Sequence, residues 1–245
     1  MCGGIEKEYL IPLISRAEQI SGIEVTTSDW ELIKKLGQKC YLLYVTKPWD
    51  ELGGTGVREY LTKKGGEKLN VRSRYKVRIR KTWYAVPGVR FPDLFMSYMS
   101  HEVPKIASNE IIVNDQKATS TNTIHQIFLK RKLEPKLLST LFYNSLTLLS
   151  AELVGGRFYG GGGVLKIEPK EAEKILIPTP EEPKEILNIS SKVDRLLRAK
   201  RTIDAVAIVN EVVLEGELGL KQRDVEVIEE AWKYLQERRI KKSLG

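Results

Sequence analysis

Hydrophobic and polar positions in the first part of the chain predict short strands and short helices. Residues 9–20 (YLIPLISRAEQI) begin as an apolar extended segment and then turn helical in character. Lys39–Lys47 has the β-branched and aromatic content of a strand, which Pro48 closes. The glycines that follow predict a loop and then a short helix near Val57–Lys64.

The strongest apolar patterns lie in the middle of the chain. Residues 92–100 (PDLFMSYMS) are apolar enough to be buried, and two short strands are expected over Glu110–Asn114 and Thr123–Leu129. A polar connection rich in Thr and Asn joins them. Glu134–Gly155 predicts one long helix, with proline at its first helical position. Its apolar stripe consists of Leu137, Leu138, Leu141, Phe142, Leu146, Leu148, Leu149 and Leu153.

The rest of the chain predicts a change of architecture. Gly155 and Gly156 are expected to end the long helix, and a strand is expected over residues 164–168. Three prolines in residues 177–183 indicate a linker, so we expect a domain boundary near residue 180. The segment after it looks helical, with packing positions at Val206, Ile208, Val209, Val212, Val213 and Leu214. The expected fold is α+β: a mixed domain of short strands and one long apolar helix (1–180), then a small all-helical module (181–245).

One stretch places a cation at every second position, at Arg72, Arg74, Lys76, Arg78 and Arg80. Successive side chains of an extended segment point to opposite faces, so a strand here would present a ladder of cations. A helix would scatter the same residues around its axis. The β-branched residues between them favour the strand without excluding the helix.

The net charge of +8 is unevenly distributed. Residues 181–245 contain 13 basic and 13 acidic residues, so the whole excess lies in residues 1–180. Lys63–Arg90 contains ten basic residues and one acidic residue, Glu67. A local cluster of this kind indicates a polyanionic partner, and the alternative is a surface that only aids solubility.

Length and composition exclude several classes of protein. The 245 residues are enough for one large domain or a domain with a smaller module, and 42% hydrophobic residues exclude a disordered chain. No apolar run approaches the roughly 18–20 residues of a membrane span, and the N-terminus lacks a signal-peptide core. The isolated Cys2 and Cys40 cannot form a disulfide framework. We therefore expect a cytoplasmic protein.

A glycine-rich loop covers residues 156–163, with Arg157, Phe158 and Tyr159 among the glycines. A P-loop requires lysine and then Ser or Thr after its last glycine, whereas a Val-Leu pair follows here. A dinucleotide-binding loop leads from a strand to a helix, and this loop leads from a helix to a strand. It is therefore a flexible connection or a loop that contacts a large polyanion.

Metal-binding and nuclease patterns are weak. His101 and His125 have no partner at zinc-site spacing, so we expect structural roles for them and no metal site. The Pro-Asp pair ending at Asp93, with a later Glu-x-Lys triplet at Glu134 or Glu168, is similar to a metal-dependent nuclease pattern. Such triplets are common by chance.

The residues of a methyltransferase active site are also missing. Adenine-N6 methyl transfer needs a polar–Pro–Pro–aromatic loop that holds the flipped base. The nearest match, Thr46–Trp49 (TKPW), lacks the first proline and the Asn or Asp. No Gly-rich turn follows an early strand to bind S-adenosylmethionine. We expect no catalytic residue and no cofactor in this chain.

In the order of its elements, the chain nevertheless resembles the C-terminal specificity region of adenine-N6 DNA methyltransferases of restriction–modification systems, the TaqI-like group. The resemblance covers most of the chain, through YLIPLISRAEQI, VRIRKTWYAVP, SNEIIVNDQKATSTNTIHQIFL and LLSTLFYNSLTLLSAELVGGRFYGGGGVLKIEPKEAEKILIP. In that family an Arg followed closely by Trp-Tyr precedes the recognition core. A helix ending in Gly-Arg and a Gly-rich turn precede a strand. The helical tail is also similar to the ends of such enzymes.

The resemblance implies a DNA target-recognition domain followed by the helical module. Enzymes of the family carry an N-terminal catalytic domain, and this sequence starts where that domain would end. The resemblance therefore implies a split-gene subunit, the product of a truncated gene or an isolated domain. The expected partners are double-stranded DNA and a methyltransferase catalytic domain or subunit, which would bind S-adenosylmethionine.

The expected DNA contacts form three groups. Cations would neutralise phosphates and position the duplex: Arg72, Arg74, Lys76, Arg78, Arg80, Lys81 and Arg90. Polar side chains would recognise bases in the major groove, unless their segment is only a solvated hairpin connection: Asn114, Gln116, Lys117, Thr119, Thr121, Asn122 and Thr123. Arg157 and Tyr159 would contact DNA or the catalytic partner. Trp83 and Tyr84 would pack on DNA or in the core.

Two other functions stay open at this point. A self-standing DNA-binding protein, such as a regulator or a type I-like specificity subunit, would fit the charge distribution. The sequence shows no second recognition unit and no long coiled-coil spacer to support that specificity subunit. A metal-dependent nuclease would require clustered carboxylates.

Overall fold

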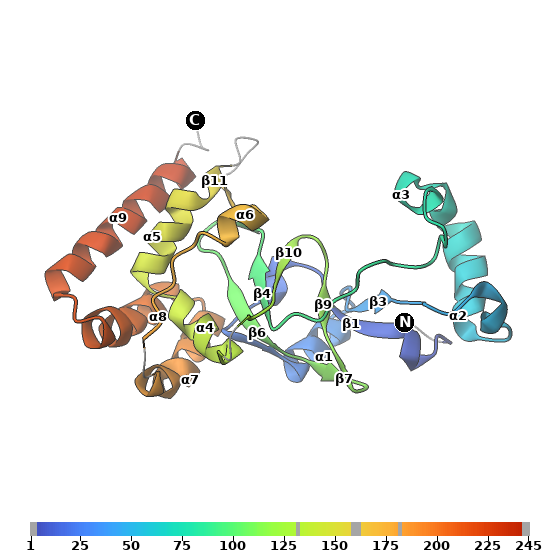
Figure 1. Ribbon diagram of the computed structural model, residues 1–245, viewed down its shortest axis with the longest axis horizontal. Helices are drawn as coiled ribbons and strands as arrows, with labels where there is room; N and C mark the ends of the chain where they lie inside the picture. The colour runs from blue at the N-terminus through green and yellow to red at the C-terminus, as the bar shows by residue number, and fades with distance from the viewer. Residues whose placement is uncertain (1–3, 131–132, 158–162, 181–182, 242–245) are drawn as a thin grey trace.

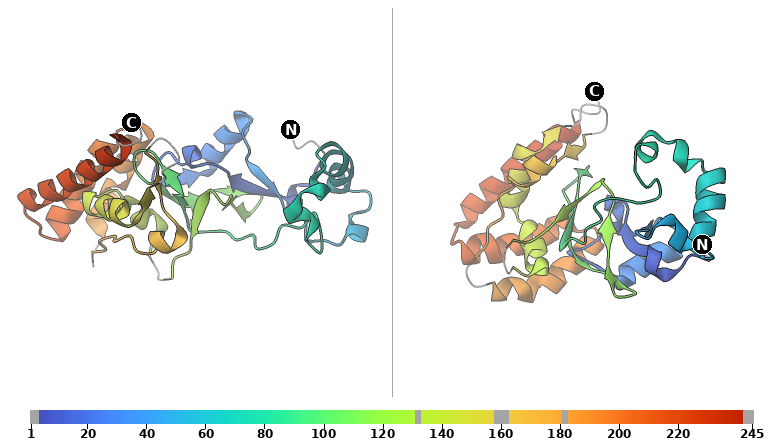
Figure 2. Two further views of the ribbon diagram at one scale, coloured as in Figure 1. Left: turned by 90° about the horizontal axis from the view of Figure 1, so that it is seen from above. Right: turned by 45° about the vertical axis from the view of Figure 1, so that its right-hand side comes forward.

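The computed structural model describes residues 4–130, 133–157, 163–180 and 183–241, with the side chains of all but 64–66 and 157. A body of short strands lies between a helical module at one end and a projecting helical arm at the other (Figure 1). The two views of Figure 2 show the same separation of arm and module by the sheets. The predicted mixed α/β fold class is confirmed.

The N-terminal segments supply strands to the body. In chain order they are η1 (Lys7–Tyr9), β1 (Leu10–Ile14), η2 (Ala17–Gln19), β2 (Glu24–Thr26), α1 (Thr27–Lys35) and β3 (Tyr41–Leu43). A capping box starts α1, because the Thr26 hydroxyl accepts from the Asp29 amide and the Asp29 carboxylate accepts from the Thr26 amide. The predicted extended start, the helical turn after it and the following strand are confirmed.

The arm is built from short helical segments. After the 3-10 turn η3 (Trp49–Leu52) come α2 (Gly56–Glu59), the π-helical η4 (Tyr60–Lys68), the 3-10 turn η5 (Val71–Ser73) and α3 (Tyr75–Arg78), which form the arm. The short helix predicted near Val57–Lys64 is confirmed, and η4 extends it. The arm is the blue-green segment that stands away from the body in Figure 1.

The strand predicted over the cationic ladder is wrong. The segment from Arg72 to Arg80 is helical, with one 3-10 turn and one α-helical turn. A strand needs a neighbour for its backbone groups, and no strand in the described residues pairs with this segment. Its backbone bonds locally instead: the Arg78 amide donates to the Arg74 carbonyl at 2.9 Å.

A four-stranded and a three-stranded sheet form the centre of the body. The remaining strands are β4 (Leu94–Ser97), β5 (Met99–Ser100), β6 (Ile106–Glu110), β7 (Ile112–Val113), β8 (Gln116–Lys117), β9 (Thr119–Ser120), β10 (Ile124–Ile127), β11 (Gly156–Arg157) and β12 (Leu165–Lys166). One sheet has the order β10-β4-β6-β2, with β2 parallel to β6, and another has the order β3-β1-β9, with β9 parallel to β1. The third sheet, β11-β12-β5, and the β7–β8 hairpin complete the set among the described residues.

The strand predicted over Glu110–Asn114 is only partly correct. The longer strand β6 ends at Glu110, and β7 covers two residues before a hairpin turn. Asn114 and Asp115 have φ angles of 49° and 61°, which Asn and Asp tolerate better than most residues. The predicted burial of residues 92–100 is confirmed for Leu94–Ser97, which form the buried strand β4, and the strands predicted over Thr123–Leu129 and 164–168 are confirmed.

The single long helix predicted over Glu134–Gly155 is wrong. It consists of α4 (Pro135–Phe142) and α5 (Ser145–Val154), which meet at 80°. The Asn144 side chain accepts from the Thr147 amide at 2.8 Å and so starts a new helix. Both halves are apolar, so the hydrophobic period hid the break. No single helix in the described residues is long and apolar enough to cross a membrane.

The C-terminal helices share the main hydrophobic core with the sheets. They are α6 (Pro169–Ala172), α7 (Lys184–Arg198), α8 (Thr202–Val209), η6 (Asn210–Glu217) and α9 (Gln222–Lys241). One buried cluster joins Leu94 and Leu141 of the body to Val193, Val206 and Trp232 of the helices. The predicted helices and their packing positions are confirmed, and the boundary near residue 180 stays a prediction.

Candidate nucleic-acid interface

The arm, which we define as residues 56–82, is anchored at its first residues. The Glu6 carboxylate accepts from the amides of Gly56 and Val57 at 2.6 and 3.0 Å, at the N-terminus of α2. Desolvation acts to raise the pKa of Glu6, but these backbone hydrogen bonds outweigh it and lower that pKa. A Cβ at position 56 would collide with the Gly4 carbonyl, so glycine permits this approach of the two backbones.

An aromatic base, formed by Trp49, Trp83 and Tyr84, holds the far end of the arm. The ring centroid of Trp49 lies 6.4 Å from that of Trp83 and 5.5 Å from that of Tyr84. The Tyr84 hydroxyl donates to the Lys47 carbonyl at 2.9 Å, and its ring belongs to the same buried cluster as Val57. The core interpretation of Tyr84 is therefore confirmed, and Trp83 packs partly against the same cluster.

A hollow of about 440 Å³ opens at this base, and Arg72 lies on its wall. The Arg72 guanidinium lies 4.4 Å from the Trp83 ring centroid and 6.0 Å from that of Trp49. Arg58 lies 4.8 Å from the Trp49 ring. Cation–π attraction thus packs two arginines onto the indole rings that also hold the arm.

Most described cations of the arm lack a carboxylate partner. Residues 56–82 contain ten basic and two acidic residues, a net charge of +8 that equals that of the whole chain. Among the described side chains of the arm, Lys63 forms an ion pair, with Glu59 at 2.8 Å. Arg74, Lys76, Arg78 and Lys81 are exposed, whereas Arg80 donates to the Ala85 carbonyl at 3.1 Å. Such a concentration of unpaired cations creates a positive field that attracts a polyanion.

Two apolar side chains stand among these cations. Tyr75 and Ile79 are 68% and 65% exposed, one helical turn apart on and just after α3. Neither packs in any of the buried clusters of the described residues. An exposed ring among cations is typical of surfaces that contact a nucleic-acid backbone and its bases together.

Part of the predicted base-contacting segment lies at the tip of the β7–β8 hairpin. Asn114 and Lys117 are exposed there. Gln116 is half-buried, and its amide oxygen has no hydrogen-bond partner among the described residues. Asn114 and Lys117 are thus accessible to a ligand from solvent.

The rest of that segment packs on the β1 strand end. The Thr121 and Thr123 hydroxyls both donate to the Ser15 carbonyl, at 3.0 and 3.2 Å, and leave Asn122 exposed between them. Thr119 is 1% exposed, which makes it a structural residue of the body. The predicted group is therefore divided between two surfaces, of which Asn122 marks the second.

Arg90 lies where the arm returns to the body. Its guanidinium lies 3.8 Å from the centroid of the Phe128 ring, and its carbonyl accepts from the Thr119 hydroxyl at 2.7 Å. Phe128 was not among the predicted site residues. Its spacing of two residues from Gln126, at the end of the segment predicted to be a strand, was the available signal, because alternate residues of an extended segment share a face.

Comparison with known proteins identifies the family. Residues 4–214 match the model of a family described as the C-terminal domain of the type II methyltransferase M.Eco57I. The chain belongs to this family. Membership confirms the expected methyltransferase C-terminal region and gives the chain a role related to a restriction–modification methyltransferase.

The match to the M.Eco57I C-terminal domain ends at Leu214. The last helix, α9, lies beyond the match but is bonded to residues within it. Arg239 of α9 donates to the Glu152 carboxylate at 2.7 and 3.0 Å, and to the carbonyls of His101, Glu102 and Gly163. The Arg239 and Glu152 side chains are 1% and 4% exposed. The helix α9 therefore completes the core of the M.Eco57I-type domain.

The glycine-rich loop is described only at its ends. Gly163 has a φ of +62°, and a Cβ there would lie 2.7 Å from the Ile240 Cα, so close packing on α9 requires glycine. Arg157 pairs its backbone in β11 with Leu165, but its side chain is not described, and Tyr159 lies outside the described residues. Their predicted contacts stay predictions.

Carboxylates of the nuclease-like pattern have structural partners in this M.Eco57I-type domain. Asp93 accepts from the Leu129 amide at 2.8 Å, and Glu168 accepts from the Tyr98 hydroxyl at 2.7 Å. His125 lies 2.7 Å from the Ile167 carbonyl through Nε2. No group of three His, Cys, Asp or Glu side chains in the described part of the chain is arranged to hold a metal ion.

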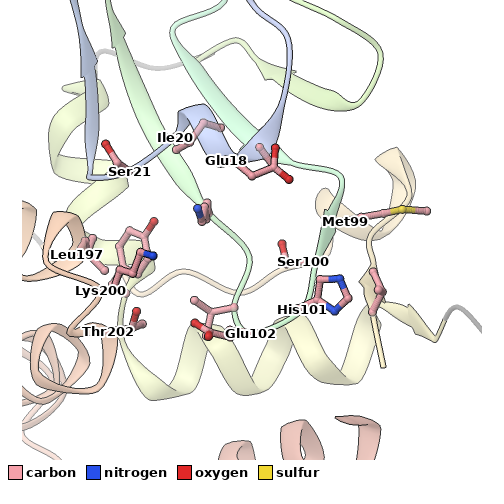
Figure 3. A pocket seen from close by; sticks show the side chains of 15 residues that line it. Glu18, Ile20, Ser21, Met99, Ser100, His101, Glu102, Leu197, Lys200 and Thr202 are labelled. Carbon is pink, nitrogen blue, oxygen red and sulfur yellow. The ribbon is translucent and has the colours of Figure 1, made fainter. Parts of the chain in front are cut away.

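A second hollow, of about 460 Å³, lies between the body and the helical module (Figure 3). Its charged lining consists of Glu18, Glu102, Lys105 and Lys200, beside His101. Burial lowers the pKa of Lys105. Two carboxylates balance two lysines, so this hollow does not select a polyanion. The positive arm is the better candidate interface.

Proposed function

We propose that this protein recognises the DNA target of an adenine-N6 methyltransferase of a restriction–modification system. The observation that carries the proposal is the arm: its 56–82 segment contains the full net charge of +8, largely without carboxylate partners among its described side chains. Family membership supports a methyltransferase-related role. DNA is the polyanion on which such an enzyme acts.

In this proposal the arm positions the duplex and the body recognises bases. Arg74, Lys76 and Arg78 contact phosphates, which gives affinity with little sequence information. The exposed amides of Asn114 and Asn122 on the body supply paired donors and acceptors for base edges in the major groove. The two surfaces belong to one chain, so phosphate contacts by the arm fix where the body meets the bases.

The chemistry of methyl transfer is assigned elsewhere in this proposal. A methyltransferase catalytic domain, in the same polypeptide or in a partner subunit, binds S-adenosylmethionine and the flipped adenine. The present residues orient the DNA for it. We place the complex in the cytoplasm, where such enzymes would meet the DNA.

The test is a salt series of binding to random-sequence duplex DNA. A triple variant, Arg74→Ala/Lys76→Ala/Arg78→Ala, removes three exposed arm cations. The matched control, Lys192→Ala/Arg195→Ala/Arg223→Ala, removes the same charge from exposed positions of the helical module. Each phosphate that no longer meets its cation reduces the slope of log K against log salt by about 0.9, so the slope of the arm variant should fall by roughly 2.7.

The control separates a local site from an effect of net charge. The proposal expects an unchanged slope for the control variant and weaker binding of all sequences by the arm variant. Equal reductions in the two variants would show that binding follows net charge alone. Absence of DNA binding by the wild-type chain at low salt would contradict the proposal.

A further inference from the structure

Phe128 is placed to hold another side chain rather than to fill the core. Its neighbours Ile127 and Leu129 pack against the main hydrophobic cluster. Phe128 belongs to none of the buried clusters of the described residues. Phe128 directly follows β10, and the Gln126 side chain two residues before it bonds to the Thr119 hydroxyl. The ring face of Phe128 is covered by the Arg90 guanidinium, 3.8 Å from the ring centroid.

Within the part of the chain that the structure describes, the Arg90 guanidinium is held by the Phe128 ring alone. Among the described residues it has no hydrogen-bond acceptor and no carboxylate within ion-pair distance, and the side chain is exposed. The Arg90 backbone is fixed, because its carbonyl accepts a hydrogen bond from the Thr119 hydroxyl. The same hydroxyl accepts from the side-chain amide of Gln126. The N–H donors of the guanidinium are therefore unused within the described part of the fold.

Other arginines of the protein show the contrast. Arg198 and Arg239 use their donors on carboxylates and carbonyls inside the fold. Arg72 also lies on rings, but those rings form the aromatic base, so its stacking serves the packing of the arm. Arg90 combines contact with a ring, donors unused among the described residues and a position on the body beside the β9–β10 segment.

We infer that Arg90 recognises a guanine of the DNA target, an inference that rests on the proposed function. The guanidinium offers two parallel N–H donors, which match the O6 and N7 acceptors of guanine in the major groove. Stacking on Phe128 limits the rotamer freedom that is given up when these bonds form. A phosphate also accepts two such bonds, so the test separates base recognition from phosphate contact.

The experiment starts with selection of preferred sites from a random-sequence duplex pool by the full chain. The same selection is made with Arg90→Ala, which removes the donors, and with Arg90→Lys, which keeps the charge but loses the planar two-donor edge. Arg74→Ala, at an exposed arm cation without a ring, is the control. Wild type and Arg74→Ala are expected to select a guanine at one shared position. Arg90→Ala and Arg90→Lys are expected to lose that preference, by about 10- to 100-fold between guanine and adenine.

Chemical substitution in the DNA then identifies the atom. Replacing the selected guanine by 7-deazaguanine removes the N7 acceptor, and wild type should bind about tenfold more weakly while Arg90→Lys is unaffected. The salt slope of Arg90→Lys should equal that of wild type, because no cation is removed.

The outcomes that overturn the inference differ from those that overturn the proposed function. If Arg90→Ala keeps the guanine preference, or if wild type binds DNA and selects no guanine, Arg90 does not recognise a guanine. If Arg90→Ala instead weakens the binding of all sequences equally, the Arg90 side chain contacts a phosphate. A chain that binds no DNA at any salt would remove the proposed function as well.

Discussion

The arm and the helical module both contain many cations, but they use them differently. In the module, Arg239 is buried against Glu152, and Arg198 bonds to Asp29 and Asp194 at 2.6 Å each. In the arm, most described cations face solvent without a carboxylate. The module has thirteen charges of each sign over 181–245, whereas the arm has ten and two. Pairing therefore separates cations that hold the fold from cations that are available to a partner.

Removal of the buried Arg239 should have the largest effect on the free energy of unfolding. Arg239→Ala leaves the Glu152 carboxylate and three carbonyls without their donor inside the core. Breaking a buried pair in this way costs about 3–5 kcal/mol of the free energy of unfolding, measured by urea denaturation. The neighbouring exposed Arg238→Ala is the control and should change it by less than about 0.5 kcal/mol. Equal effects would mean that α9 is not fixed by this pair.

Loss of the Asp29 carboxylate from the Arg198 network should reduce the free energy of unfolding by an amount that depends on pH. Partial burial acts to raise the pKa of Asp29, but hydrogen bonds from Arg198 and Thr26 outweigh it and lower that pKa. Its stabilising contribution is therefore present above the unfolded pKa of about 3.9 and is lost as pH falls through the lower folded value. Asp29→Asn should reduce the free energy of unfolding by about 2 kcal/mol at pH 7, because it removes hydrogen bonds to a charged group.

Urea denaturation from pH 7 to pH 3 measures this difference. The gap between wild type and Asp29→Asn should stay constant above about pH 5 and narrow below pH 4. Glu230→Gln, an exposed change on α9, is the matched control. A gap that does not narrow in acid would show that the destabilisation comes from packing and not from the carboxylate charge.

Removal of the Asn144 cap, at the bend between α4 and α5, should have a smaller effect on the free energy of unfolding. Asn144 is fully buried and caps α5, so Asn144→Ala should cost about 1–2 kcal/mol in thermal or urea unfolding. Asn188→Ala, an exposed change within α7, should be neutral or slightly stabilising because alanine favours a helix. An Asn144 variant as stable as wild type would show that packing alone determines the bend.

The arm variant should give the smallest effect on stability. Arg74→Ala/Lys76→Ala/Arg78→Ala removes exposed side chains without partners, so the free energy of unfolding should change by less than about 0.5 kcal/mol. Circular dichroism during urea denaturation measures it. A decrease of more than about 2 kcal/mol would mean that these cations also hold the arm.

The sequence by itself determined the features that depend on neighbouring residues. The α+β class, the helical tail and the position of the positive charge follow from hydrophobic period and composition, because these are local properties. The cap formed by Asn144 was also present in the sequence. It was hidden by the continuous apolar pattern on both sides of the break.

Tertiary structure decided the features that depend on distant partners. The segment from Arg72 to Arg80 alternates like a strand, but it found no partner strand in the described part of the fold and closed local helical turns. The stacking of Arg90 on Phe128 joins residues 38 positions apart, 128 minus 90, across the return of the arm. Pairing between distant side chains is set by how the elements pack, so the sequence predicted where the cations lie but not which of them are free.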